Sequence, residues 1–444
     1  MKIAMIAPSS GKWKAAANSA IFNGKTFRFS LLSLLTVAAE TPEGHDILLI
    51  DEQVDDIPWD KRFDLVAITC MTALAPRAYE IAESFRSKNI PVILGGIHPT
   101  LCPDEAEQHA DAIVVGDAEG VWQTVLNDLQ HGMLKNRYKS KVLPDLTRLN
   151  RLPRQLLKSR HYSTVNGLQA TRGCTNKCNF CSVSAFHNQT HRVRPVKEVV
   201  KEMAGFQSRF CIFVDDNLTA DREYAKELFH AIEPLRKFWV SQSSIAIADD
   251  PEFVRLGANS GCIGFFIGIE TFSNKNLLKS EKYCNRAEWY KEAIALFHSF
   301  GIAVEAGIVF GFDNDSTEVF QNSLRLLDEL EIDAAQISIL TPIPGTALYK
   351  GVNERIFDHD WGHYDFHTAV FHPNRMTASE LQDGHDWVTR KFYSPARIMK
   401  RVVNHMKRTK KLATLPYVAA VNMAYYGRVK RWNISGRNPV ANEC

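Results

Sequence analysis

The chain has 444 residues, with 53 Lys and Arg against 50 Asp and Glu and a formal net charge of +3. So small a charge gives no electrostatic reason to bind nucleic acid, and the length predicts about three domains of ordinary size. No apolar run reaches the roughly 18 residues of a membrane span, and the apolar start Met1–Pro8 predicts a buried strand rather than a signal peptide. Nine cysteines without a paired pattern favour a reducing cytoplasm over a disulfide framework.

Residues 1–140 alternate short apolar runs with helical patterns, which is typical of a parallel sheet covered on both faces. The expected strands are Ile3–Ala7, Ile47–Ile50, Leu65–Thr69, Pro91–Leu94 and Ala112–Val115. The expected helices are Leu31–Ala39, Ala75–Ser87 and Glu119–Leu129. The pattern predicts a Rossmann-like α/β domain, which binds ligands at the loops that follow its strands.

Two of those loops carry distinctive sequences, Gly95-Gly-Ile-His-Pro-Thr100 and Val114-Val-Gly-Asp-Ala-Glu119. A tight turn without a ligand explains the paired glycines on their own. Together, the two turns resemble those of the cobalamin-binding domain that begins a large class of radical S-adenosylmethionine (SAM) enzymes. The resemblance implies two groups of contacts, Cys70, Met71 and Thr72 near the cobalt, and Gly95, Gly96, His98 and Glu119 near the nucleotide tail or the corrin edge.

One motif of other cobalamin proteins, D-x-H-x-x-G, is absent from this region. We therefore expect any corrinoid to bind base-off, without a histidine ligand to cobalt. A domain that no longer binds a corrinoid is the alternative. Residues 141–165 contain Pro144 and Pro153 among several charges and show no clear period, so they predict a linker.

Residues 166–350 repeat the strand–helix alternation six times, which predicts a (β/α)6 partial TIM barrel with its chemistry at the strand C-terminal ends. The expected strands are Gly167–Thr171, Phe210–Val214, Trp239–Ile247, Gly264–Ile269, Val304–Phe310 and Ala335–Leu340. The expected helices are centred near Val199, Ala225, Phe253, Ala293 and Leu324.

After the first of these strands, Cys174, Cys178 and Cys181 stand in a C-x3-C-x2-C spacing. Four thiolates normally hold a four-iron cubane, so three leave one iron open to a substrate or cosubstrate. Zinc with His187 or His191 as its fourth ligand is one alternative. A simple electron carrier is another, but it would want a fourth cysteine nearby, and Cys211 is separated from the loop by a predicted helix.

The Arg-Gly lead-in and Phe180, directly before the last cysteine, make this loop resemble the cluster loop of the radical SAM superfamily. The resemblance implies a 4Fe–4S cluster on the three cysteines, with SAM on the free iron and cleaved to a 5′-deoxyadenosyl radical. It also implies SAM contacts at the ends of the later strands, at Asp215, Asp216, Asn217, Glu270, Gly307, Gly311 and Ile343. Ser243 joins this set as a polar group on the third strand, while Val309 and Asn314 depart from the fifth-strand motif.

Residues 351–444 change character and predict a helical C-terminal region. The aromatic and histidine-rich stretch Trp361–Phe371 predicts a lid over the barrel mouth, with a metal site as the alternative. Thr377 followed by Glu380 predicts a capped helix start. The apolar segment Leu412–Tyr426, flanked by Lys and Arg, fits either a helix packed on the barrel or one lying in a membrane interface.

The sequence as a whole predicts a cytoplasmic radical SAM enzyme that methylates an unactivated centre through methylcobalamin. The alternatives are cyclisation or rearrangement of a hydrophobic substrate such as a tetrapyrrole ester, because the subgroup also resembles the anaerobic magnesium-protoporphyrin ester cyclases, and a non-catalytic iron–sulfur or zinc scaffold. We expect a small-molecule substrate, an electron donor such as flavodoxin or ferredoxin, no nucleic acid, and peripheral membrane contact if the tail is interfacial.

Overall fold

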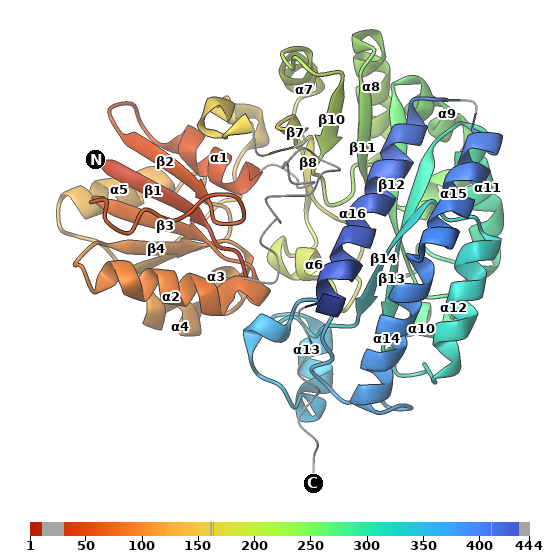
Figure 1. Ribbon diagram of the computed structural model, residues 1–444. Helices are drawn as coiled ribbons and strands as arrows, with labels where there is room; N and C mark the ends of the chain where they lie inside the picture. The colour runs from red at the N-terminus through yellow and green to blue at the C-terminus, as the bar shows by residue number, and fades with distance from the viewer. Residues whose placement is uncertain (11–30, 160–161, 163, 410, 435–444) are drawn as a thin grey trace.

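The computed structural model describes residues 1–10, 31–159, 162, 164–409 and 411–434. Two parallel sheets of six strands each stand side by side, and helices cover both of them (Figure 1). The last ten residues of the predicted tail lie outside the described residues. Among the described residues, no helix is both long and apolar enough to cross a bilayer.

The N-terminal sheet has the strand order β2-β1-β3-β4-β5-β6, and all of its pairs are parallel. Ile3 and Met5 of β1 lie in one apolar core, and Ala4 and Ile6 lie in another, because successive residues of a strand point to opposite faces. The strands are β1 Lys2–Ala7, β2 Asp46–Asp51, β3 Leu65–Thr69, β4 Val92–Gly95, β5 Ala112–Val115 and β6 Arg137–Lys139. The α-helices are α1 Leu32–Glu40, α2 Ala75–Arg86, α3 Ile97–Leu101, α4 Pro103–Ala106 and α5 Trp122–Gln130.

The second sheet is the partial barrel, with the order β14-β13-β12-β11-β10-β7. Its main strands are β7 Gly167–Leu168, β10 Phe210–Phe213, β11 Phe238–Ser243, β12 Cys262–Glu270, β13 Ala303–Phe310 and β14 Ala334–Ile339. Its covering helices are α7 Val196–Ala204, α8 Arg222–Ile232, α9 Pro251–Asn259, α10 Asn274–Lys279, α11 Tyr290–Ser299 and α12 Glu318–Glu329. The predicted fold class is confirmed, although β6 was not predicted as a strand.

Two predicted strands end differently in the structure. The first stops at Leu168, because the carboxylate of Asp215 accepts hydrogen bonds from the backbone N–H groups of Ala170 and Thr171. The chain then forms β8 (Thr171–Gly173), which pairs antiparallel with β9 (His191–Val193). The third stops at Ser243, because the Ser244 side chain accepts a hydrogen bond from the backbone of Ala246 and begins a 3-10 turn.

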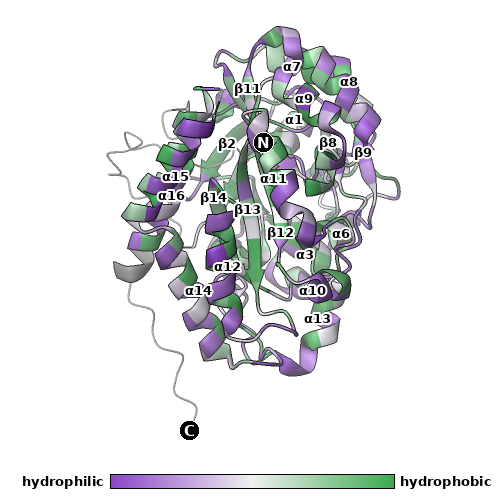
Figure 2. Cartoon of the chain, turned by 90° about the vertical axis from the view of Figure 1, so that its right-hand side faces the viewer, coloured by the Kyte–Doolittle hydropathy of each residue, from purple (hydrophilic) through white to green (hydrophobic). Residues whose placement is uncertain are grey.

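The C-terminal region contains α13 Ala347–Val352, α14 Ala378–Phe392, α15 Pro395–Arg408 and α16 Thr414–Ile434. Thr377 and Glu380 form the predicted capping box of α14. Figure 2 shows the apolar strands of the barrel behind helices whose outward faces are largely hydrophilic. Helix α14 contacts α12 and β14, and α16 contacts β12 and β14, so the helical tail packs on the barrel.

Helix α16 lies against the inner face of the barrel sheet, where it contacts β12 and β14. Tyr425 and Tyr417 donate hydrogen bonds to Glu305 of β13, at 2.7 and 3.4 Å. Neighbouring Val304 and Ala306 face the helix-covered core, so Glu305 points inward. With Val418 and Val421 of its apolar segment also buried, α16 follows the packed-helix alternative of the sequence analysis.

Asp333, at the start of β14, holds the two last helices to the barrel. Its carboxylate accepts hydrogen bonds from His405 at 2.8 Å and His298 at 2.9 Å and also pairs with Arg408. Burial alone would raise the pKa of Asp333, but the donors around it outweigh burial and hold the pKa well below its ordinary value. Asn422 of α16 donates to the Asp333 backbone carbonyl at 2.8 Å.

Replacing Asp333 tests whether its carboxylate holds the last two helices to the barrel. Because the folded-state pKa is depressed, the carboxylate contributes stability above its unfolded value of 3.8 and loses it as the pH falls from there toward the folded value. Asp333→Asn should lower the free energy of unfolding by about 3–5 kcal/mol at pH 7, since it removes the buried charge that pairs with Arg408. Urea unfolding between pH 7 and 3 should show the difference from wild type shrinking below pH 3.8. Asp328→Asn, which removes a surface pair with Arg397, is the control and should cost less than about 1 kcal/mol. An equal loss in both variants would contradict this account.

Candidate active site

The three cysteines lie on the loop between β8 and the short helix α6 (Ser182–Phe186), at the C-terminal end of the barrel strands. The loop is anchored on both sides. Asn179 donates its backbone N–H to Ser280 and accepts from the backbone of Leu348, at 3.1 and 2.9 Å. Asn217 points its amide at the sulfur of Cys174, at 3.6 Å. The anchors place the cysteines on the face where a β/α barrel carries its chemistry.

The donor set fits a cluster better than a single ion. Zinc–sulfur bonds of about 2.3 Å in a tetrahedron would bring the sulfurs within about 4 Å of each other. Among the described residues, the one group of three ligands that gathers within 4.8 Å is His98, Cys102 and Glu105, and the cysteine triad is not part of it. Burial raises the pKa of Cys178 to about 12, so this thiol would become a thiolate only with a strong positive charge such as cluster iron beside it. Cys174, Cys178 and Cys181 would hold that cluster, and the predicted zinc alternative is not favoured.

The two aspartates after β10 have different surroundings. Asp215 is fully buried and accepts three hydrogen bonds, from the backbone of Ala170 and Thr171 and from the Thr171 hydroxyl. Burial raises its pKa to about 7. Asp216 is partly exposed, and its Oδ2 accepts from the backbone N–H of Gly173 at 2.8 Å. Asp215 therefore shapes the loop, while Asp216 remains able to receive the amino group of SAM.

Glu270 ends β12 with the backbone in the left-handed region, at φ 64°, which is uncommon outside glycine. Its carboxylate pairs with Lys282 at 2.9 Å, and both side chains are mostly buried. Burial lowers the pKa of Lys282, but the charge of Glu270 outweighs this and raises it overall. Such local strain at a strand end is typical of functional sites, and this ion pair lies beside Cys178.

The remaining predicted SAM residues lie on the later strands or in the loops that follow them. The hydroxyl groups of Ser243 and Thr219 are hydrogen-bonded to each other at 2.7 Å. Gln242, which lies on the opposite face of β11, is exposed. A Cβ at Gly307 would come within 3.0 Å of the Phe266 ring, so close packing requires glycine there. Gly311 has φ 103°, and Ile343 is buried against Tyr364 and Val370 of the lid.

The lid reaches across to the N-terminal sheet. Its 3-10 turn Trp361–His363 packs on α2 and on the 3-10 turn Thr72–Leu74 that follows β3. Helix α3 contacts α6, and Leu101 lies 3.0 Å from where a Cβ on Gly345 would stand. The loops after β3 and β4 are thus brought to the mouth of the barrel (Figure 1).

Of the residues predicted near a corrinoid, Met71 is the most open, with 54% of its surface exposed. Cys70 and Thr72 are buried. Gly96 adopts φ 104°, and a Cβ there would lie 2.9 Å from the Cys70 carbonyl oxygen, so this glycine lets two loops pack. Gly95 has no such close neighbour, and Glu119 is paired with Arg172 at 2.6 Å.

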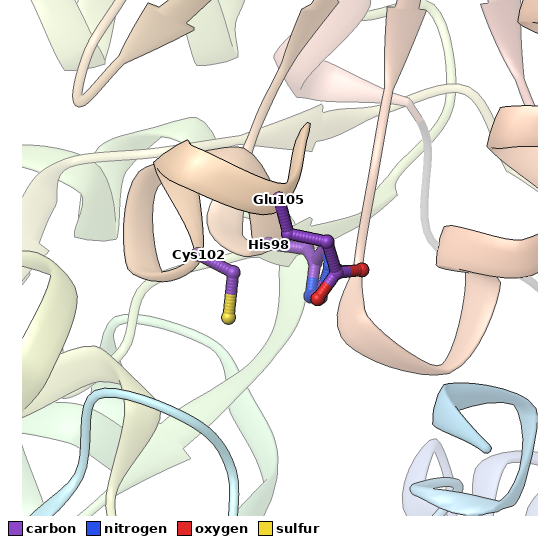
Figure 3. Close-up of side chains that lie close together, drawn as sticks. All are labelled: His98, Cys102 and Glu105. Carbon is purple, nitrogen blue, oxygen red and sulfur yellow. The ribbon is translucent and has the colours of Figure 1, made fainter. Parts of the chain in front are cut away.

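His98, the last of that set, is fully buried and lies close to Cys102 and Glu105 on the α3–α4 turns (Figure 3). The carboxylate of Glu105 accepts hydrogen bonds from Trp361 at 2.8 Å and from Tyr79 at 3.0 Å. His98 Nε2 lies 3.0 Å from the same Tyr79 hydroxyl. These contacts form a hydrogen-bonded network that joins the lid to the N-terminal domain, and they leave little for a metal ion to satisfy.

Comparison with known proteins agrees with this arrangement. The family model of the radical SAM superfamily matches residues 168–327, and that of the B12 binding domain matches residues 32–126. The chain is 32% identical to the bacteriochlorophyllide d C-12(1)-methyltransferase of Chlorobaculum tepidum over 84% of each chain. The chain belongs to the radical SAM superfamily. It falls in the branch of methyltransferases that carry an N-terminal B12-binding domain, and the predicted enzyme class is confirmed.

Two further similarities support this radical SAM assignment. The bacteriochlorophyllide d C-8(2)-methyltransferase of the same organism is 30% identical over 75% of this chain and 79% of its own. The structure of TsrM, a radical SAM methyltransferase from Kitasatospora setae with cobalamin and an iron–sulfur cluster bound, superposes over 98% of both chains with a TM-score of 0.67 and 15% identity. At 15% identity, the superposition shows a shared fold and nothing more. The family's cofactors, a 4Fe–4S cluster, SAM and a corrinoid, are those predicted from the sequence.

Sequence reasoning missed several residues of this radical SAM site. Lys282 pairs with Glu270, twelve positions earlier, and no local sequence pattern predicts this ion pair. Gln242 was passed over for Ser243, although alternation along the strand could have separated their faces. Arg172 was predicted only as part of the cluster-loop motif. Its ion pair with Glu119 was missed, because Glu119 lies in the other domain.

Proposed function

We propose that this enzyme methylates a carbon of a tetrapyrrole related to bacteriochlorophyllide, using SAM and a corrinoid held between its two domains. The observation that carries the proposal is the 32% identity, over 84% of both chains, to a bacteriochlorophyllide methyltransferase. Both the B12-binding domain and the cluster loop lie within the matched family models. Cyclisation, the alternative reaction, is supported by a weaker similarity, because the anaerobic magnesium-protoporphyrin IX monomethyl ester cyclase of Rubrivivax gelatinosus is 26% identical over 76% of this chain and 68% of its own.

The cofactors would supply the methyl group and the radical that removes a hydrogen atom from the substrate carbon. The chain's own residues bind and orient them. Cys174, Cys178 and Cys181 would hold the cluster, and Asp216 would accept hydrogen bonds from the amino group of SAM as a charge-assisted contact. Met71 would lie near the cobalt, and the lid from Trp361 to Phe371 would exclude water from the barrel mouth.

A large flat substrate would need apolar surface inside the barrel mouth, and the chain provides some. Phe266 and Val309 face the inner side of β12 and β13, opposite the residues packed under the helices. Phe180 and Phe312 stack edge to face beside the cluster loop, with ring centroids 6.2 Å apart. Aromatic rings of this kind suit the faces and edges of a tetrapyrrole.

The test is incubation of anaerobically reconstituted protein with SAM, a reductant, hydroxocobalamin and bacteriochlorophyllide d. The expected product carries one additional methyl group, and the bound cob(II)alamin should show a base-off spectrum without nitrogen splitting from a histidine in electron paramagnetic resonance. Protein that takes up no corrinoid, or that cleaves SAM yet leaves every tetrapyrrole offered at its original mass, would overturn the proposal.

We further propose that flavodoxin or ferredoxin supplies the electron. Peripheral membrane contact would have to use the partly exposed residues of α16, because Val418 and Val421 are already buried against the barrel. Flotation with anionic liposomes tests for such contact, because basic residues such as Lys430, near the C-terminal end of α16, would be attracted to anionic headgroups.

A further inference from the structure

The β8–β9 hairpin, which leads into the cluster loop, is docked on the N-terminal domain by two arginines. Arg172 of β8 reaches Glu119 at 2.6 Å and Asp117 at 3.3 Å. Both acids lie in the turn after β5, and the Arg172 and Glu119 side chains are only 9% and 8% exposed. The ion pair crosses between domains at the base of the cluster loop.

Arg192 of β9 stands directly opposite Arg172 in the antiparallel register. Two like charges across a strand pair repel each other and destabilise the hairpin. Asp117 lies between them, with its second oxygen 2.8 Å from Arg192. An acid from the N-terminal domain thus compensates a repulsion that the barrel domain leaves in its own hairpin.

The contacts continue to Asp216, the acid that we propose binds the amino group of SAM. Arg192 lies 3.3 Å from Nδ1 of His187, whose Nε2 is 3.6 Å from Oδ2 of Asp216. That same oxygen accepts from the backbone of Gly173, the residue before the first cluster cysteine. Gly173 itself has no room for a side chain, because a Cβ would lie 2.1 Å from the Thr190 carbonyl oxygen.

We propose that the acidic turn Asp117–Glu119 docks the cluster hairpin, and that Arg172 and Arg192 are positioning residues that fix the cluster and Asp216 relative to the corrinoid. Glu119 then contacts the barrel domain instead of the corrinoid. The part of this inference that concerns the corrinoid rests on the proposed function, whereas the docking of the hairpin does not. Transfer between groups held on separate domains needs the reacting atoms within a fraction of an ångström of their productive positions.

The experiment compares Glu119→Gln and Arg172→Met with Arg194→Met. Arg194 follows β9 and pairs with Glu202 at 2.7 Å, with similar burial but entirely within the barrel domain, so it is the matched control. All three proteins should keep their iron and corrinoid. In the first two, the spin–spin interaction between cob(II)alamin and the reduced cluster should weaken, and methyl transfer per SAM cleaved should fall roughly 10–100-fold. Arg172→Lys should restore part of both.

An unchanged spin–spin interaction and an unchanged transfer ratio in Glu119→Gln and Arg172→Met would overturn the inference.

If the wild-type protein binds no corrinoid, the proposed function fails and the docking is tested by calorimetry of the cofactor-free protein. There, wild type and Arg194→Met should unfold in one transition, whereas the docking variants should show two, and a single transition in all would overturn the inference. If Arg172→Met does not fold, the double variant Arg172→Met/Glu119→Met, which leaves neither member of the pair charged, replaces it in both measurements.

Discussion

Replacing any one of Cys174, Cys178 or Cys181 with alanine should abolish reductive cleavage of SAM, a loss of roughly 10⁴-fold or more. Three thiolates would hold the cluster that delivers the electron, and no other side chain would substitute for a missing one. Iron and sulfide analysis, together with the formation of 5′-deoxyadenosine, measures the effect. The expected iron content falls well below four per chain in each variant.

Cys284 provides the control for this cysteine prediction. It lies near enough to Cys178 for the charges of the two to interact, yet it is on the loop after α10 and outside the triad. Cys284→Ala should keep four irons and cleave SAM. If it loses the cluster while one of the triad variants keeps it, the assignment of the three ligands is wrong.

Replacing Glu270 with alanine should affect both stability and SAM binding. The buried ammonium of Lys282 would lose its partner, which should lower the free energy of unfolding by about 3–5 kcal/mol. Loss of a charge-assisted contact to SAM should weaken its binding by roughly tenfold or more. Calorimetric unfolding and isothermal titration with SAM measure the two effects separately.

A double variant separates those two effects. Glu270→Gln/Lys282→Met removes both charges, so stability should return toward that of wild type while SAM affinity stays low. Asp216→Ala is the companion variant, because Asp216 is more exposed and its loss should weaken SAM binding with a smaller loss of stability. Wild-type SAM affinity in the double variant would mean that Glu270 only balances the charge of Lys282.

The sequence by itself determined the elements and the cluster loop. Apolar runs of four to nine residues separated by helical periods predicted the two parallel sheets, because burial on both faces leaves that pattern in the chain. The C-x3-C-x2-C spacing predicted the cluster, because its three ligands lie within one loop. Thr377 and Glu380 predicted a helix start, because a capping box is a local interaction.

Only the tertiary structure decided which of the predicted site residues are free to bind a ligand. Asp215 and Asp216 are neighbours in the sequence, yet the first is fully buried and bonded to the backbone of the loop, while the second is partly exposed. The turn that contains Glu119 predicted a contact with the corrinoid. In the structure Glu119 instead pairs with Arg172, which lies 53 positions away in another domain. The energy of a buried ion pair depends on distance and burial, and neither quantity is encoded by the spacing of residues along the chain.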